Sequence, residues 1–306
     1  LIGFSMNKLF VPILLLSLVF AGCGDDDEYV APSQPVSTLS IDVSTPGTLA
    51  SAISAGVRDE VVELTLSGRI NGSDVAVLRE MAGSDLTGGR TEGSLRRLDM
   101  SAVQVVEGGD AYFRDGDTDF VTSNNVIGDH FFDGCKSLVA VTLPTNVVRV
   151  GDNAFSDCYL LRTVGISTGV VEIGDEAFRF CHDLEGLELP LGLQTIGDRA
   201  FVECNSIKSL DLPVGLATIG AEAFEGCTSI ADVYMPQGVQ SIGYNAFKDC
   251  VALSELHCRA ITPPACQTGT FEGVNRDVCR LFVPTGSADT YAAARGWQDF
   301  KNIIEE

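Results

Sequence analysis

The stretch IGDRAFVECNSIKSLDLPVGLAT, residues 196–218, decides the fold of this chain. It belongs to a series of similar units that begin 23 residues apart, at Ile127, Val150, Ile173, Ile196, Ile219 and Ile242. Each unit carries a cysteine at the same position, namely Cys135, Cys158, Cys181, Cys204, Cys227 and Cys250. Because neither disulfide frameworks nor zinc sites have this spacing, the pattern indicates an internal repeat.

Each unit predicts one short strand and one turn. Leu210 and Leu212 alternate with polar residues, as inward side chains of a strand do, and Pro213 ends the strand because it has no N–H for the ladder. Asp198 is expected to cap a short helical turn that carries Phe201 inward. One unit buries too little apolar surface to be stable alone, so the units must stack. The sequence therefore predicts an α/β solenoid, a right-handed coil with one parallel sheet, short helical or 3-10 turns on its other side and degenerate caps at both ends.

The unit I-G-x-x-A-F-x-x-C-x-x-L-x-x-L-x-L-P resembles the BspA-type leucine-rich repeats of bacterial surface proteins. The resemblance covers about residues 127–284. It implies a leucine-rich-repeat solenoid that needs no cofactor and serves non-catalytic adhesion to an extracellular protein or glycan, on host matrix or on other cells. Two alternatives stay open: a structural spacer of the cell envelope without a ligand, and an exported enzyme with an unrecognised site.

The first residues predict export and anchoring. A positive residue, Lys8, precedes the apolar run 9–20, which is too short to span a membrane as a helix. The small residues Ala21 and Gly22 then lead into Cys23, and this order resembles the lipobox of bacterial lipoproteins. We therefore expect Cys23 to be lipidated and to attach the chain to a membrane through its acyl chains alone. An ordinary signal peptide or a buried strand is the alternative.

The acidic run 25–28 resembles the tract that accompanies delivery of lipoproteins to the outer face of the outer membrane. A solvated linker is the alternative for this run. We expect a lipid-anchored, surface-exposed protein of the outer membrane. The chain then divides into a lipoprotein signal peptide (1–22), a lipidated cysteine with a flexible acidic and Pro/Ser-rich tether (23–40), degenerate N-terminal cap repeats with an insertion (41–126), six 23-residue leucine-rich repeats (127–260), and a degenerate last repeat with a C-terminal cap helix (261–306).

The two caps carry signals of their own. Residues 61–66 repeat the spacing of the strand leucines, and a short helix is expected over 73–82 with Ser73 as its N-cap. At the other end, Tyr291 and Trp297 are placed to cover the last apolar face. Terminal repeats of a solenoid need such atypical covers.

The composition excludes some functions. The chain has 306 residues, with 42 acidic against 20 basic side chains and a net charge of −22, so we expect no nucleic-acid partner. None of the histidines, His130, His182 and His257, has the spacing of a metal ligand pair, and no nucleophile lies in a recognisable motif. We therefore expect no enzyme, no metal, no cofactor and a monomer.

Cysteines and one acidic loop leave alternatives open. The six repeating cysteines are expected to be buried free thiols, with chained disulfides or a metal ladder as alternatives. Outside the repeat, a disulfide could join Cys266 to Cys279, or Cys258 to Cys279. Residues 115–119 resemble the start of a calcium loop but lack its later glycine and glutamate, so a solvated loop is the default.

The outward positions of the predicted sheet carry the candidate binding residues. They flank the second leucine of each repeat and become acidic toward the C-terminus. We expect a recognition patch for a basic or hydroxyl-rich partner, with a solubilising polar face as the alternative. The patch consists of Glu188, Asp211, Asp232, Tyr234, Glu255 and His257.

Overall fold

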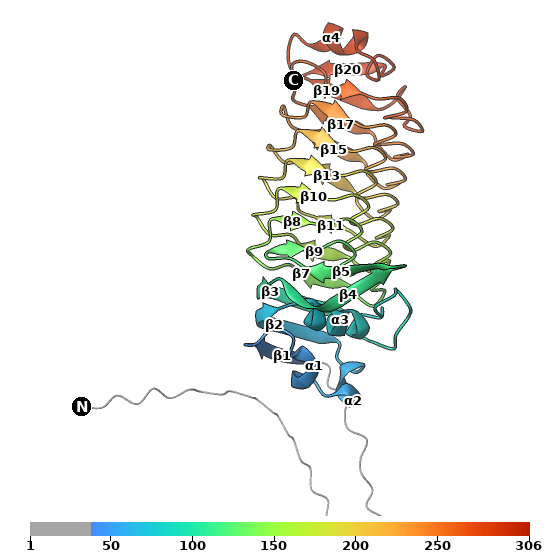
Figure 1. The fold of residues 1–306 in the computed structure, drawn as a ribbon. Coiled ribbons are helices and arrows are strands. Elements are labelled where there is room, and N and C mark those ends of the chain that lie inside the picture. The colour runs from blue at the N-terminus through green and yellow to red at the C-terminus, as the bar shows by residue number, and fades with distance from the viewer. Residues whose placement is uncertain (1–37) are drawn as a thin grey trace, which may run out of the picture. The chain divides into compact units, whose positions relative to one another are not determined.

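The computed structural model describes residues 38–306 of the chain. In this range the chain winds into coils that stack along one axis, with the strands lying across it (Figure 1). The strands form three parallel sheets and one antiparallel hairpin. The predicted parallel solenoid is confirmed, but the expectation of one parallel sheet is wrong, because each repeat contributes a second short strand and the side that holds the repeat leucines is interrupted. The signal peptide and the lipidation of Cys23 fall outside the described residues, as does most of the tether.

One side of the coil, here called the main face, is built from the strands that hold the repeat leucines. Its first sheet contains β1 (Thr38–Val43), β2 (Glu63–Ile70), β3 (Arg97–Val105), β7 (Ala140–Thr142), β9 (Thr163–Gly165) and β11 (Gly186–Leu187). Its second sheet contains β13 (Ser209–Asp211), β15 (Asp232–Met235), β17 (Glu255–Cys258), β19 (Arg280–Val283) and β20 (Asn302–Glu305). The strands β11 and β13 occupy equivalent repeat positions but do not pair, so the main face is interrupted between them.

The third sheet continues past this interruption. It consists of two-residue strands in the order β18 (Ala265–Cys266), β16 (Ser241–Ile242), β14 (Thr218–Ile219), β12 (Thr195–Ile196), β10 (Glu172–Ile173), β8 (Arg149–Val150) and β6 (Val126–Ile127). Its register advances by one repeat at each step, as in Ile173↔Ile196↔Ile219. The coils therefore stay in contact along this edge while the main face opens locally.

Turns, not helices, connect the third sheet to the main face in residues 127–250. Each turn holds non-glycine residues with left-handed backbone, such as Arg199 at φ 55° and Glu203 at φ 59°, and these conformations interrupt a helix. The expected helix cap is accordingly wrong for Asp198. Its carboxylate instead accepts the backbone N–H of Ala221 in the next coil, at 2.6 Å.

The interior is a column of aromatic rings. Phe155, Phe178, Phe201, Phe224 and Phe247 are fully buried, and consecutive rings stack with centroids 5.2 or 5.3 Å apart. The repeating cysteines are buried free thiols, as expected. Five of them, all but Cys135, also donate from Sγ to phenylalanine carbonyls of the preceding coil, for example Cys204 to Phe178 at 3.2 Å. Each of these carbonyls also accepts a backbone N–H, so the thiol adds a second hydrogen bond between coils as well as filling space.

Glycine lets the coils approach closely at the start of each repeat. A Cβ atom at Gly197 would lie 2.6 Å from the carbonyl carbon of Gly174, closer than real Cβ contacts. The backbone angle of Gly197 is ordinary, so the requirement here is space between coils rather than conformational freedom.

The N-terminal cap corrects two expectations. Strand β1 begins at Thr38, inside the segment expected to be a tether, because Leu39, Ile41 and Val43 alternate inward against β2. Helices α1 (Leu49–Ala52) and α2 (Ala55–Arg58) follow, then α3 (Gly72–Met81). The N-cap of α3 is Asn71, not Ser73: Asn71 accepts the N–H of Ser73, and a capping box with Asp74 completes the helix start.

A buried arginine joins this cap to the first repeat. Arg79 of α3 is fully buried, and its guanidinium donates to the carbonyl oxygens of His130 at 2.7 Å and Asp133 at 3.0 Å. The insertion beside it forms the hairpin β4 (Gly108–Asp115) and β5 (Thr118–Thr122). Its tip contains the calcium-like residues, where Asp119 forms an ion pair with Arg114.

The C-terminal cap agrees with the sequence. Helix α4 (Ala288–Ala293) begins after Ser287, and Tyr291 and Trp297 are fully buried. The indole of Trp297 packs on Phe271, the last ring of the column, at 5.3 Å. Among the described residues, no helix is long and apolar enough to cross a membrane.

Candidate binding face

The outward side chains of the second sheet form two columns across its strands. Strand register aligns Ser209, Asp232, Glu255 and Arg280 in one column and Asp211, Tyr234, His257 and Phe282 in the other. The inward neighbours Leu210, Val233, Leu256 and Leu281 are buried. The expected alternation of inward and outward residues is therefore correct for these strands.

A groove lies where the main face is interrupted. It encloses about 850 Å³ and runs along the ends of β11, β13 and β15. Its floor includes Leu212 and Met235, which are nearly buried, and Leu187 and Leu189, which are only half-buried. The sequence pattern placed both of these leucines fully inward, so the third full repeat is the one that departs from it.

Glycine accounts for the interruption. Strand β11 starts with Gly186, at the position occupied by Thr163 in β9 and Ser209 in β13. A glycine in a strand offers no side chain to pack against its neighbours and weakens pairing. Strand β11 is accordingly two residues long and pairs only with β9.

The rim of the groove is amphipathic. Two apolar side chains, Leu191 and Val214, stand 74% and 72% exposed on the loops that follow the strands. The carboxylates of Glu188 and Asp211 lie beside them, and neither makes an ion pair within residues 38–306. Arg259 is the single cation that lines the groove. The groove thus presents apolar surface next to negative charge.

The structure divides the expected patch into two groups. Glu188, Asp211 and Tyr234 border the groove, and Asp232 lies half-buried on β15 beside it. The side chains of Glu255 and His257 do not line the groove and belong to a network that adjoins it through Tyr234. The exposed Leu191 and Val214 were missed from the sequence, although an apolar residue between proline and glycine in a surface loop was the available signal.

In this C-terminal network His257 is held on all sides. Its ring stacks between Tyr234 at 4.5 Å and Phe282 at 4.3 Å. Its nitrogens face Glu255 at 3.4 Å and Glu306 at 3.2 Å, and Glu255 also pairs with Arg280. Because the ring faces of His257 are covered, this part of the face offers ring edges rather than open aromatic planes.

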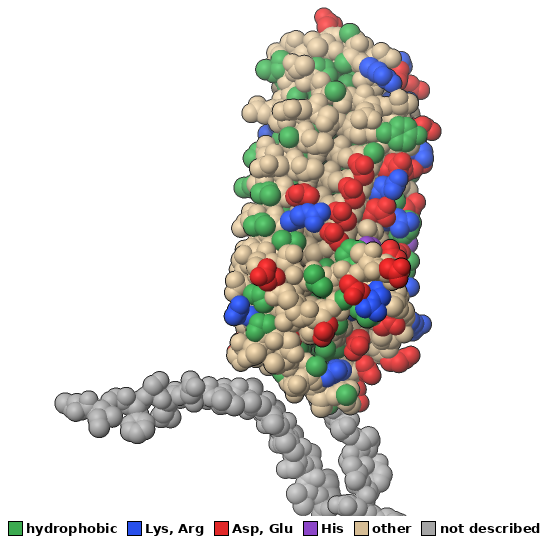
Figure 2. All heavy atoms as spheres, viewed as in Figure 1, with side chains coloured by type: hydrophobic (Ala, Val, Ile, Leu, Met, Phe, Trp, Pro, Cys, Tyr) green, Lys and Arg blue, Asp and Glu red, His purple; other side chains and the backbone are tan. Residues whose placement is uncertain are grey.

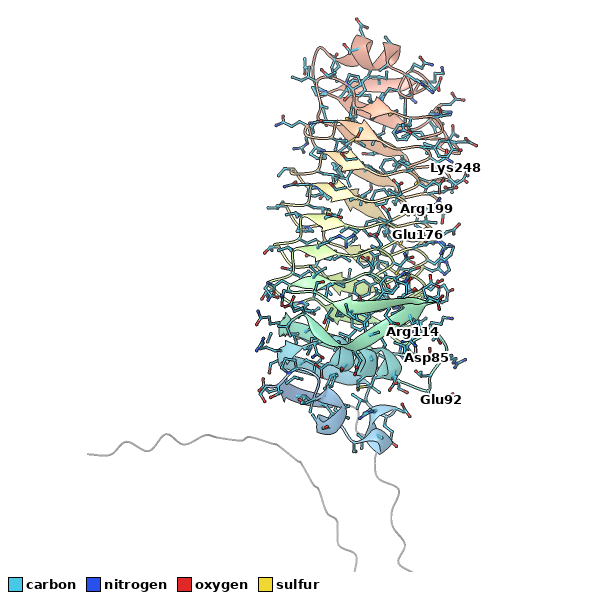
Figure 3. The ribbon with its side chains drawn as sticks, viewed as in Figure 1. Asp85, Glu92, Arg114, Glu176, Arg199 and Lys248 are labelled. Carbon is cyan, nitrogen blue, oxygen red and sulfur yellow. The ribbon has the colours of Figure 1, made fainter. Side chains whose placement is uncertain are left out.

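The turn side carries ladders of charge. Figure 2 shows acidic and basic side chains gathered in a band along one side of the stack. Arg199 bridges Glu176 at 3.0 Å and Glu222 at 2.7 Å, one repeat to either side (Figure 3). Lys248 bonds Glu225 at 2.6 Å in the same way. These charges pair within the protein.

The other chemical candidates do not form sites in the part of the chain that is described. Cys266 and Cys279 are free thiols, so the disulfide that the sequence allowed between them is not formed. Cys266 belongs to the third sheet, whereas Cys279 directly precedes β19 on the main face. Cys258 is also free, and the hydroxyl of Tyr291 donates to its Sγ at 3.0 Å. No group of three or more metal-ligating side chains comes together in residues 38–306.

Sequence comparison agrees with this geometry. A stacked coil with buried leucines on a parallel sheet defines a leucine-rich-repeat solenoid. Residues 125–254 match the model of the BspA type Leucine rich repeat region, in six copies. The repeats of this chain are therefore BspA-type leucine-rich repeats. No match was found among curated proteins.

Three solved structures are similar to parts of the chain. A Leucine Rich Repeat protein of T. pallidum is 37% identical over 43% of this chain and 61% of its own, with a TM-score of 0.42. A leucine-rich repeat protein from Bacteroides ovatus is 25% identical over 55% of this chain and 45% of its own, with a TM-score of 0.46. A leucine rich cell surface protein from Faecalibacterium prausnitzii is 17% identical over 88% and 79%, with a TM-score of 0.30. The chain spans about three fifths of the first of these and less than half of the second.

Proposed function

We propose that this chain is a non-catalytic binding protein of the cell surface that recognises a protein partner through the groove of its main face. The observation that carries the proposal is the exposure of Leu191 and Val214 beside the carboxylates of Glu188 and Asp211. Exposed apolar side chains at a hollow, rimmed by polar groups, are typical of interaction sites. Repeat scaffolds suit such a role because they present a long, rigid and variable surface.

The chemistry of the groove specifies the partner. Its apolar floor fits aliphatic or aromatic side chains, and its carboxylates fit lysine, arginine or hydroxyl groups. The net charge of −22 strengthens the attraction of a basic partner at long range. A glycan is the less favoured ligand of this face because the aromatic ring faces around His257 are already stacked on each other.

The proposed location follows from the sequence. The lipobox-like residues before Cys23 and the acidic run 25–28 support a lipid anchor in the outer membrane with the solenoid outside the cell. The family of the repeats supports a surface protein. Protease treatment of intact cells tests this: loss of the solenoid without lysis is expected, and protection of the solenoid contradicts surface exposure.

Binding is tested on an array of extracellular matrix proteins and glycans. The full chain should bind at least one matrix protein saturably. The reversals Asp211→Lys and Asp232→Lys should abolish that binding, because both place a positive charge at or beside the groove. The control Glu60→Lys changes the net charge equally at an exposed residue of the N-terminal cap and should leave binding intact. Unchanged affinity in both reversals rules out this groove, and no binding to any array member supports a structural spacer instead.

A further inference from the structure

A second hollow lies at the opposite ends of the strands, where the chain enters the main face. It encloses about 570 Å³ and is bordered by the loop 90–96, by residues 136–137 and by Leu160. We call it the basic hollow because Arg90, Arg96 and Lys136 line it. All three side chains belong to exposed residues, and none makes an ion pair within residues 38–306.

Three cations without an ion pair come together in this hollow, and the ammonium of Lys136 also lies over the ring of Tyr159 at 5.6 Å. The chain carries only 20 basic residues against 42 acidic ones, and many of the others pair along the charge ladders or at strand edges. In the basic hollow the one carboxylate is that of Glu92, on the loop labelled in Figure 3. A local positive site on a strongly negative protein attracts anions to that site.

The hollow is built on a fixed frame. The hydroxyl of Ser137 donates to the carbonyl of Gly93 at 2.8 Å, and that of Thr91 donates to the carbonyl of Glu80 at 2.6 Å. The N–H of Leu95 also bonds the carbonyl of Met81 at 2.9 Å. These bonds attach the loop 90–96 to α3 and to the coil that contains Ser137. The backbone that carries Arg90 and Arg96 is therefore fixed before a ligand binds, and less conformational entropy is lost on binding.

We propose that the basic hollow binds a short anionic oligosaccharide that carries sulfate or carboxylate groups. The guanidinium group of arginine binds such oxyanions through two parallel N–H groups, and the ammonium group of lysine adds a compact positive charge. The hydroxyls of Thr91 and Ser137 donate to backbone carbonyls and can accept from sugar hydroxyls, and the hydroxyl of Ser94 adds a further partner. The volume is in the range of sites for small organic ligands and far exceeds what a single sulfate ion fills.

Charge elsewhere on the molecule limits the length of the ligand. A long polyanion or an anionic membrane surface would also meet the net negative charge of the chain, −22, and be repelled. A short oligosaccharide meets the three cations and, among the carboxylates that line the hollow, that of Glu92 alone. This site is separate from the groove of the proposed function, and either one can fail without the other.

The test uses titration calorimetry on the full chain with a heparin tetrasaccharide at low salt. Saturable binding with one site per chain is expected, and it should weaken as salt rises. Lys136→Gln should weaken the affinity by about tenfold, the value of one hydrogen bond to a charged group. The matched control Lys208→Gln removes the same charge from an exposed residue three coils further along and should have no effect.

A second variant should change the affinity for the tetrasaccharide in the opposite direction. Glu92→Gln removes the one carboxylate of the hollow and should strengthen binding several-fold, an effect that a folding defect would not produce. Two comparison ligands, inorganic sulfate and anionic phospholipid vesicles, test which class of anion the hollow binds. If inorganic sulfate binds as tightly as the tetrasaccharide, or if anionic phospholipid vesicles co-sediment the chain through Lys136, the oligosaccharide proposal is wrong. It is also wrong if no tetrasaccharide binding is seen or if Glu92→Gln leaves the affinity unchanged.

Discussion

Single side chains repeat their role in every coil, so a substitution in one coil tests the role in all of them. Phe178 lies in the centre of the ring column, stacked on Phe155 and Phe201 at 5.2 Å on both sides. Phe178→Ala should lower the free energy of unfolding by about 3–5 kcal/mol, because it removes a buried ring and leaves a cavity. Urea unfolding followed by circular dichroism measures the change.

The control for this substitution is Phe180→Ala, two residues further on the turn. Phe180 is only half-buried and lies beside Arg179, so its loss should cost much less. A cost below about 1 kcal/mol for Phe178→Ala would mean that Phe178 is not part of a packed interior.

The repeating cysteines allow a second prediction for single residues. The two possible roles of the thiol predict opposite orders of stability for the serine and alanine variants. If the S–H of Cys204 satisfies the carbonyl of Phe178, Cys204→Ser retains a donor and should cost less stability than Cys204→Ala. The difference should be about 1 kcal/mol, the net value of one hydrogen bond. If the thiol only fills space, serine buries an unpartnered hydroxyl and should cost more than alanine. Urea midpoints of the two variants decide.

Neighbouring coils are joined by an aspartate ladder, a column of four carboxylates at equivalent positions. Its members are Asp129, Asp152, Asp175 and Asp198. Each accepts the backbone N–H of the next coil, as Asp175 does from Asp198 at 2.7 Å. Burial and the neighbouring Asp129 raise the pKa of Asp152, against the pull of Arg149. Arg149 pairs with Asp129 and Asp152, whereas Asp175 and Asp198 have no cationic partner in residues 38–306. The hydrogen bonds therefore hold like charges together.

Asp175→Asn separates these two effects. The amide oxygen keeps the bond from Asp198 while the charge is lost, so the variant should be more stable by about 0.5 kcal/mol, since like charges on adjacent strands repel. The gain should shrink as sodium chloride screens the repulsion in the parent protein. Asp277→Asn, at an exposed aspartate outside the ladder, serves as the control. A loss of stability in Asp175→Asn would show that the carboxylate charge itself holds the ladder.

The difference between local sequence patterns and contacts between distant residues explains what could be predicted from the sequence. The 23-residue period predicts the stack, the buried phenylalanines and the caps because these depend on spacing and on apolar character alone. The interruption after β11 depends on what Gly186 fails to contact in the next coil, which no local pattern records. The buried Arg79 and the aspartate ladder likewise depend on partners that are distant in sequence or on backbone groups.

The candidate site shows this limit most clearly. The outward positions of Glu188, Asp211 and Tyr234 follow from strand alternation, and these three do border the groove. The network that Glu255 and His257 form outside the groove could not be predicted, because it is produced by Phe282, Arg280 and Glu306. The basic hollow could not be predicted because Lys136 lies 40 residues after Arg96 in sequence and comes beside it only when the coils stack.

At alkaline pH, the buried thiols should dominate the pH dependence of the free energy of unfolding of the whole solenoid. Burial raises the pKa of every column thiol above its ordinary value of 9.0, to about 12 for Cys135 and Cys250. Between these values the unfolded chain loses thiol protons that the folded chain retains. The folded state then binds more protons, so the free energy of unfolding falls as the pH rises above about 9.

Each thiol contributes a slope of about 1.4 kcal/mol per pH unit, so the six column thiols together contribute roughly 8 kcal/mol per unit. Below pH 9 this stabilisation is fully present, and the folded thiols should resist iodoacetamide. Urea midpoints measured from pH 7 to 10.5 should be level and then fall steeply. Cys258, Cys266 and Cys279 also have a raised pKa, so nine described thiols contribute to the fall. Cys204→Ala removes one of them and should flatten the fall by about one ninth. A midpoint that stays level to pH 10.5 would mean that the column thiols have the same pKa in the folded and the unfolded chain. The column would then not be sealed from water, because burial is the largest cause of the raised pKa of each column thiol.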